Sequence, residues 1–266
     1  MRALSRLKLP KEHGAWAMLY VPMLAGVLVA GAFPLSVFLL TLSATSVFIG
    51  RGPLLAWLRA RRRRKESGGL RDLALGYIAC AFVFGAPLIL VYRLFWLLVL
   101  GLLTIILLWI NSALAAQGRD RGVAGEIFAI SGLALGAPAA YYVASGRLGT
   151  AALWLWVLSV LYFTSSVFYV KMRVLSSNRR RVEAYRGARL YCASYHALLF
   201  VGLIALAALG NFNLLILMAF APALARALFY FVRPMGPLSL KRIGVQEIVY
   251  SAIFLILVAL TLRPAV

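Results

Sequence analysis

Nine apolar stretches, separated by glycine, proline or charged residues, take up most of this chain. Each is close to the roughly 20 residues that a helix needs to cross about 30 Å of hydrocarbon. Apolar residues make up 64% of the 266 positions, whereas a soluble domain has about 45–50%. We therefore predict an all-α polytopic membrane bundle in a single integral membrane domain, residues 1–266, with helices at 14–31, 34–50, 72–92, 94–111, 123–144, 150–170, 190–209, 212–231 and 246–262.

The basic residues are distributed very unevenly between the two sides of this bundle. Of the 28 Lys and Arg residues, 25 fall in the tail 1–13 and in alternate connections, which leaves Arg93, Arg147 and Arg263 on the other side. The positive-inside rule then predicts a protein of the cytoplasmic membrane with its N-terminus in the cytoplasm and its C-terminus outside. All seven carboxylates lie on the predicted cytoplasmic side. Topology thus explains the net charge of +21, and we predict no nucleic-acid partner.

An internal repeat relates the two long basic connections. Residues 44–51 match residues 164–171 at a constant offset of 120. The offset predicts two four-helix halves, about 14–122 and 123–231, followed by the helix at 246–262, a 4+4+1 arrangement. It also places Arg51 and Lys171 at equivalent helix ends. Packed around a pseudo-twofold axis, both cations would face one cavity and suit an anionic head group; alternatively, each extends to lipid phosphates.

The stretch from Pro10 to Met18 joins the basic tail to the first helix and contains the adjacent residues Glu12 and His13. A histidine beside a carboxylate can transfer protons, so both are candidate catalytic residues. The alternative is structural: Glu12 complements the helix dipole and His13 forms a local hydrogen bond. Neighbouring residues do not face each other on a helix, which leaves the two interpretations balanced.

Other polar side chains at the predicted cytoplasmic helix ends are candidates for binding a substrate: Asn111, Glu126, Arg173, His196 and Glu247. His196 lies one to two turns inside its helix and needs a polar partner, for which Glu247 is one choice. The tyrosines nearby are typical of the aromatic belt at a membrane interface. We therefore regard these five residues as possible cavity groups, with a structural role as the alternative.

The helix predicted at 123–144 contains Gly132, Gly136 and Pro138. Glycine and proline allow a close-packed or kinked inner helix beside a cavity. The cysteines, Cys80 and Cys192, both lie within predicted helices and suggest neither a disulfide framework nor a metal site. We predict no cofactor and no metal ligands.

Three segments carry a resemblance to a known family: residues 10–18, residues 133–142 and Tyr169-Val170-Lys171. They resemble the YwiC-like family of uncharacterised bacterial membrane proteins, and the likeness spans most of the chain. Nine helices with long cytoplasmic connections after the second and sixth also look like the UbiA superfamily of intramembrane prenyltransferases. That resemblance implies an all-helical barrel open to the cytoplasm and to lipid.

The Asp-rich motifs that hold magnesium in the UbiA superfamily are absent from this sequence. No carboxylate occurs from His13 to Lys65, and the second long connection contains only Glu183. A diphosphate bridged by Mg²⁺ needs carboxylate oxygens, so no metal residues transfer from the family. Arg51 and Lys171 stand at the corresponding helix ends, which suggests that an anionic group is bound directly.

These observations lead to one functional hypothesis and one alternative. The hypothesis is a cytoplasm-facing cavity that binds a membrane lipid, isoprenoid- or quinone-like, with a polar or phosphorylated head. As an enzyme, a metal-independent or degenerate transferase, it would use Arg51 and Lys171 for the head, Glu12 or His13 for proton transfer and Asn111 for positioning. The alternative is a non-catalytic protein: a solute or lipid transporter, or a subunit of a respiratory or cofactor-assembly complex. The sequence makes no prediction of oligomeric state.

Overall fold

The computed structural model describes residues 13–62, 69–116, 122–177, 182–210, 212–232 and 239–262. These residues form ten helical segments and, within those ranges, no strand. The helices are α1 (His13–Ala30), α2 (Leu35–Arg62), α3 (Leu70–Leu90), α4 (Trp96–Ala116), α5 (Val123–Ala134), α6 (Gly136–Ser145), α7 (Thr150–Ser176), α8 (Val182–Ala208), α9 (Leu215–Val232) and α10 (Leu240–Leu262).

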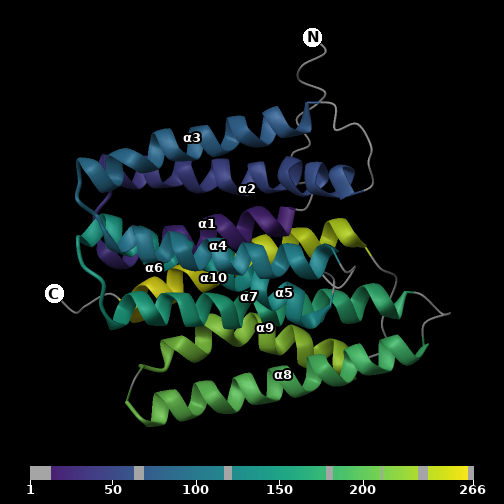
Figure 1. Ribbon diagram of the computed structural model, residues 1–266. Coiled ribbons are helices and arrows are strands. Elements are labelled where there is room, and N and C mark those ends of the chain that lie inside the picture. The colour runs from purple at the N-terminus through teal and green to yellow at the C-terminus, as the bar shows by residue number, and fades with distance from the viewer. Residues whose placement is uncertain are drawn as a thin grey trace.

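The helices account for the nine predicted membrane crossings. Eight spans are long and apolar enough to cross a bilayer, and α5 and α6 together form one of them; α1 is a shorter apolar helix. Successive spans run back and forth between the two ends of the bundle (Figure 1). The order of the spans accommodates the 4+4+1 arrangement, while the symmetry between the halves stays a prediction. The prediction of an all-α, multi-pass bundle is confirmed.

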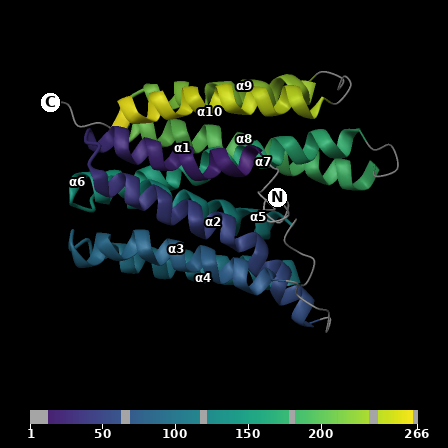
Figure 2. The ribbon, with the colours of Figure 1, turned by 90° about the horizontal axis from the view of Figure 1, so that it is seen from above.

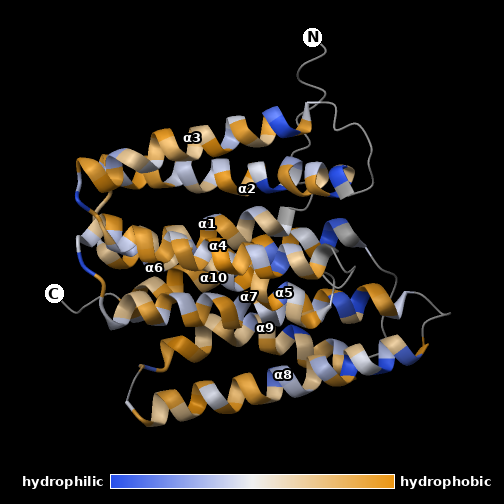
Figure 3. Ribbon diagram, viewed as in Figure 1, coloured by the Kyte–Doolittle hydropathy of each residue, from blue (hydrophilic) through white to orange (hydrophobic). Residues whose placement is uncertain are grey.

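The two ends of the bundle differ in polarity (Figure 3). We call the end at which α1 begins and α2 ends the basic end, because hydrophilic residues gather there. Several helices reach further at this end than hydropathy indicated: α2 continues to Arg62 and α7 to Ser176, while α8 begins at Val182 and α10 at Leu240. The helix boundaries predicted at residues 50, 170, 190 and 246 were therefore wrong. Arginine, alanine and leucine favour the helix even after the apolar run has ended.

Two large apolar clusters hold the bundle together, and a third, of five buried residues, joins α7, α8 and α10. The larger surrounds α7 and joins it to α1, α6, α8, α9 and α10. The smaller lies between α1, α2 and α6, where the Trp16 ring packs against Phe48 with 4.9 Å between the ring centroids. Helices α3 and α4 lie at the periphery (Figure 2), and most of their side chains are exposed or only half-buried. In a bilayer, these two helices face lipid.

The fifth span is broken at Leu135, between α5 and α6, as its glycines and proline predicted. The segment after the break packs closely against α1. A Cβ atom added at Gly26 would lie 2.3 Å from the carbonyl oxygen of Ala137, so α1 and α6 approach backbone to backbone. This contact fixes α6 beside the N-terminal helices and turns α5 toward α4.

Candidate functional site: an apolar cavity with a polar end

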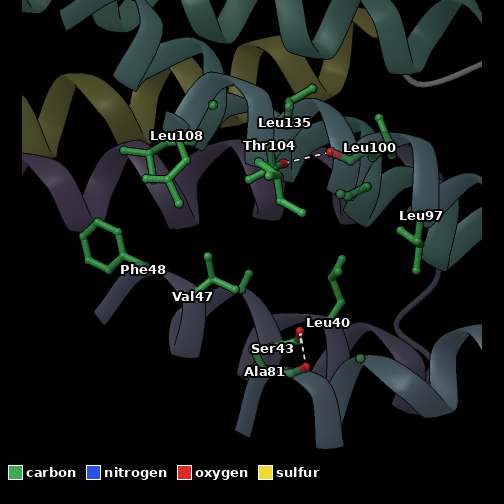
Figure 4. A pocket seen from close by; sticks show the side chains of 18 of the residues that line it. Leu40, Ser43, Val47, Phe48, Ala81, Leu97, Leu100, Thr104, Leu108 and Leu135 are labelled. Atoms are coloured by element: carbon green, nitrogen blue, oxygen red, sulfur yellow. Dashed lines mark hydrogen bonds between the residues drawn. The ribbon is translucent and has the colours of Figure 1, made fainter. Parts of the chain in front are cut away.

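A cavity of about 550 Å³ lies among α1–α6. Its walls are the α2–α3 hairpin on one side and α4, α5 and α6 on the other, with α1 behind (Figure 4). Two hydroxyl groups of the wall already donate to backbone carbonyls at 2.8 Å, Ser43 to Ala81 and Thr104 to Leu100. What these walls present to a ligand is therefore almost entirely hydrocarbon.

Arg51 and Asn111 give this cavity a polar end. The guanidinium of Arg51, on α2, donates a hydrogen bond to Oδ1 of Asn111, on α4. The Nδ2 group of the buried Asn111 donates in turn to the carbonyl oxygen of Gly125 at 2.7 Å. Because its NH₂ group is held by α5, the amide can only present its oxygen to Arg51. The arginine is thereby fixed at the basic end of an apolar chamber.

The cavity opens sideways between α3 and α4. Lining residues on both helices are exposed on the outside of the bundle, among them Phe82, which is 74% exposed, and Ile105. Among the described helices, α3 packs extensively only against α2, and α4 only against α5. An apolar molecule in the surrounding bilayer would therefore meet this chamber without crossing the polar loops.

Lys171 lies outside this cavity, on the other side of α5. Its Nζ atom is 2.6 Å from Oε2 of Glu126, and both side chains are partly exposed. All residues that line the cavity belong to α1–α6 or the break at Leu135, whereas Lys171 belongs to α7. The expectation that Arg51 and Lys171 face one chamber is therefore not met. The start of α5 separates them: Gly125 accepts from Asn111, and the next residue, Glu126, pairs with Lys171.

The two candidate catalytic residues cannot be placed in this geometry. Glu12 lies outside the described residues, and His13 is described only as the first residue of α1. Of the residues assigned to the head group, to positioning and to proton transfer, which are Arg51, Lys171, Asn111, Glu12 and His13, the structure thus brings together Arg51 and Asn111. Glu12 and His13 stay predictions.

A second polar cluster lies within α7, α9 and α10. Arg226, on α9, forms an ion pair with Glu247, on α10. Its guanidinium also stacks on Tyr169 and Tyr250, 3.9 Å and 5.2 Å from the ring centroids. Arg226 is one of the 25 basic residues that were assigned to the cytoplasmic side from their place in the sequence. A single cation inside the apolar run 212–231 is the signal that could have identified it.

His196 does not pair with Glu247, so that suggestion was wrong. Its Nδ1 atom is 2.7 Å from the carbonyl oxygen of Cys192, and its Nε2 atom is 2.9 Å from Oγ of Ser165. A carbonyl only accepts hydrogen bonds, so Nδ1 carries the proton and Nε2 accepts from the serine. Both ring nitrogens are satisfied within the bundle. The arrangement is that of a structural histidine joining α7 to α8.

Arg173, the remaining candidate, is buried near the end of α7 that lies at the basic end. Its guanidinium stacks on Tyr230 of α9, 4.7 Å from the ring centroid. The Tyr230 ring lies 5.7 Å from that of Tyr169. Arg173 therefore belongs to the second polar cluster rather than to the apolar cavity.

No metal site is evident in the described part of the chain. Within it, no group of three or more His, Cys, Asp and Glu side chains is placed to hold a metal ion. The chemical groups that the apolar cavity offers are a guanidinium and an amide. The guanidinium can donate to an anion or a carbonyl, while the amide is already engaged by Arg51 and Gly125.

The apolar spans define a multi-pass integral membrane protein. More narrowly, the chain belongs to the YwiC-like protein family, whose model matches residues 9–141, half of the chain. It is 27% identical to the "Uncharacterized protein YwiC" of Bacillus subtilis and 25% identical to an "Uncharacterized protein" of Haemophilus influenzae, with 95% of this chain and 97% of each relative covered. No solved structure matches significantly, so the resemblance to the UbiA superfamily stays a prediction.

Proposed function

We propose that this protein binds a membrane lipid with an isoprenoid- or quinone-like tail in the cavity of α1–α6. The polar or phosphorylated head of the lipid would lie at Arg51 and Asn111. The observation that carries the proposal is an apolar chamber, open toward lipid, with a guanidinium fixed at one end. All residues that line it fall within the segment that the family model matches.

The size and lining of the cavity suit part of such a lipid. Small-molecule pockets commonly measure about 300–1,000 Å³, and this one measures about 550 Å³. Each buried methylene group contributes about 0.8 kcal/mol, so several prenyl units would be held strongly. The end of a longer lipid tail would pass out of the cavity between α3 and α4, where lining residues such as Phe82 are exposed.

The polar end supplies recognition of the head group. A guanidinium forms charge-assisted hydrogen bonds to phosphate oxygens and can also donate to a carbonyl. Asn111 orients Arg51, and Glu126 with Lys171 ties the start of α5 to α7. By the positive-inside rule, we place the basic end in the cytoplasm and the protein in the cytoplasmic membrane. Any transfer chemistry would be carried out at this end, where Glu12 and His13 are the candidate proton-transfer groups.

The proposal is tested by mass spectrometry of the lipids that copurify with the protein. Arg51→Gln removes the cation, Ala44→Phe fills the chamber, and Arg59→Gln is the matched control, because Arg59 is exposed on the same helix. We expect one isoprenoid- or quinone-like species to be enriched with wild type and with the control, and to be lost from the other two proteins. Equal lipid profiles in all four folded proteins would refute the proposal.

A further inference from the structure

Arg226 is one of two arginines that are buried among the described residues. It is 5% exposed and lies six residues before the end of α9 at Val232, about 9 Å along the helix. A charged side chain at such a place is costly and commonly marks a functional site. Its Nη1 group pairs with Glu247, and its flat face stacks on Tyr169.

The remaining edge of this guanidinium is unused. Nε and Nη2 of Arg226 are buried and have no hydrogen-bond partner among the described residues. These two groups form the side-on edge, whose parallel N–H bonds match two oxygens of a carboxylate or phosphate. The ring of Tyr169 stacks on the same guanidinium. Its hydroxyl is likewise buried without a hydrogen-bond partner in the described ranges. A pair of donors with this geometry is expensive to bury unless an acceptor meets it.

The surroundings of this edge also favour an anion. Arg173 is 4% exposed and stacks on Tyr230, whose ring lies beside that of Tyr169. Two buried guanidinium groups therefore flank one pair of tyrosines. Tyrosine rings and guanidinium faces cover the sides of the cluster, which shields it from the bulk solvent that would weaken an ionic interaction.

We propose that Arg226 and Tyr169 form a second ligand site, which binds an oxyanion, a phosphate or carboxylate group, on the Nε–Nη2 edge. The group can belong to a small solute or to the head of an anionic lipid. This site is separate from the apolar cavity, because it is built from α7, α9 and α10 rather than from α1–α6.

The test measures oxyanion binding to the purified full-length protein in nanodiscs of neutral phosphatidylcholine. Inorganic phosphate and acetate are titrated at constant ionic strength, with chloride as the reference, and binding is followed by calorimetry and thermal unfolding. A parallel series adds phosphatidic acid to the nanodiscs. Binding of phosphate or acetate identifies a soluble ligand, whereas a response to phosphatidic acid alone identifies a lipid head; either supports the site.

Arg226→Lys is the decisive variant. Lysine keeps the charge beside Glu247 but lacks the planar fork, so we expect the affinity to fall about tenfold or more. Arg189→Lys is the matched control, because Arg189 is an exposed arginine whose guanidinium donates to the carbonyl of Phe231. Arg51→Gln removes the cation of the proposed lipid cavity, so the saturable oxyanion binding that this variant retains is the binding we expect at Arg226.

Tyr169→Phe provides an independent readout if the lysine variant does not fold. It removes only the unpartnered hydroxyl, and we expect a several-fold loss of affinity with little loss of stability. Two results would overturn the proposal: no saturable response of wild type to phosphate, acetate or phosphatidic acid, or unchanged affinity in the folded variants at both positions.

Discussion

Among the described residues, three ion pairs differ in how deeply they are buried. We predict that the loss of stability on removing one partner increases with that burial. The side chains of Arg186 and Glu183 are 72% and 86% exposed, those of Lys171 and Glu126 are 28% and 27% exposed, and those of Arg226 and Glu247 are 3% and 17% exposed. Removing one partner of a buried pair leaves an uncompensated charge. The energetic cost should therefore rise steeply along the series.

In each pair, the glutamate is replaced by glutamine. Removal of one partner from a buried pair costs about 3–5 kcal/mol; because water still reaches Glu247, we expect about 3 kcal/mol for Glu247→Gln, at the lower end of that range. For Glu183→Gln we expect less than about 0.5 kcal/mol, since exposed pairs contribute little. Glu126→Gln should fall between them.

Unfolding in mixed micelles with increasing sodium dodecyl sulfate, followed by circular dichroism, measures these differences. The double variant Arg226→Met/Glu247→Leu removes both charges at once, so it should recover most of the stability that Glu247→Gln loses. Equal costs for Glu247→Gln and Glu183→Gln would refute the reasoning. A double variant less stable than Glu247→Gln would refute it as well.

Three further predictions follow from single contacts and from the charge distribution. Gly26→Leu should cost about 2 kcal/mol or more in the same unfolding assay, because its Cβ would lie 2.3 Å from the Ala137 carbonyl; Gly76→Ala, with open space around it, should instead stabilise by up to about 1 kcal/mol. Tyr195→Phe should cost about 1 kcal/mol, since its hydroxyl donates to the carbonyl of Leu161 at 2.8 Å. Alkaline phosphatase fused to the C-terminus should be active in cells and the same enzyme fused to the N-terminus inactive; the reverse would contradict the predicted orientation.

The membrane helices could be predicted from the sequence because each crossing is a run of apolar residues of sufficient length. Their ends could not. Hydropathy measures the part of a helix inside hydrocarbon, whereas α2 continues beyond Gly50 to Arg62 as a helix rich in arginine. The break at Leu135 was predictable, because Gly136 and Pro138 interrupt an otherwise regular span.

The candidate site could be predicted only in part. A sequence indicates how deep a residue lies along a membrane helix better than it indicates which neighbouring helix the side chain faces. Arg51 and Asn111 were singled out by separate arguments, and the structure joins them. His196 and Glu247 were matched by depth alone, but His196 contacts Ser165 of α7, and Glu247 pairs with Arg226 of α9. Arg226 was missed because it stands near the end of an apolar run, where a cation resembles a loop residue.

The two outer helices of the apolar cavity, α3 and α4, belong to different helix pairs. Helices α2 and α3 make their most extensive contacts with each other, and α4 packs extensively only against α5. Among the described helices, no extensive contact ties α3 to α4, whereas the smaller apolar cluster and the Arg51–Asn111 hydrogen bond hold α2 to the opposite wall. Under the proposed function, such a chamber would select a lipid by its head group and would tolerate tails of different length and saturation, so the protein would serve a mixed pool of lipids rather than a single homologue.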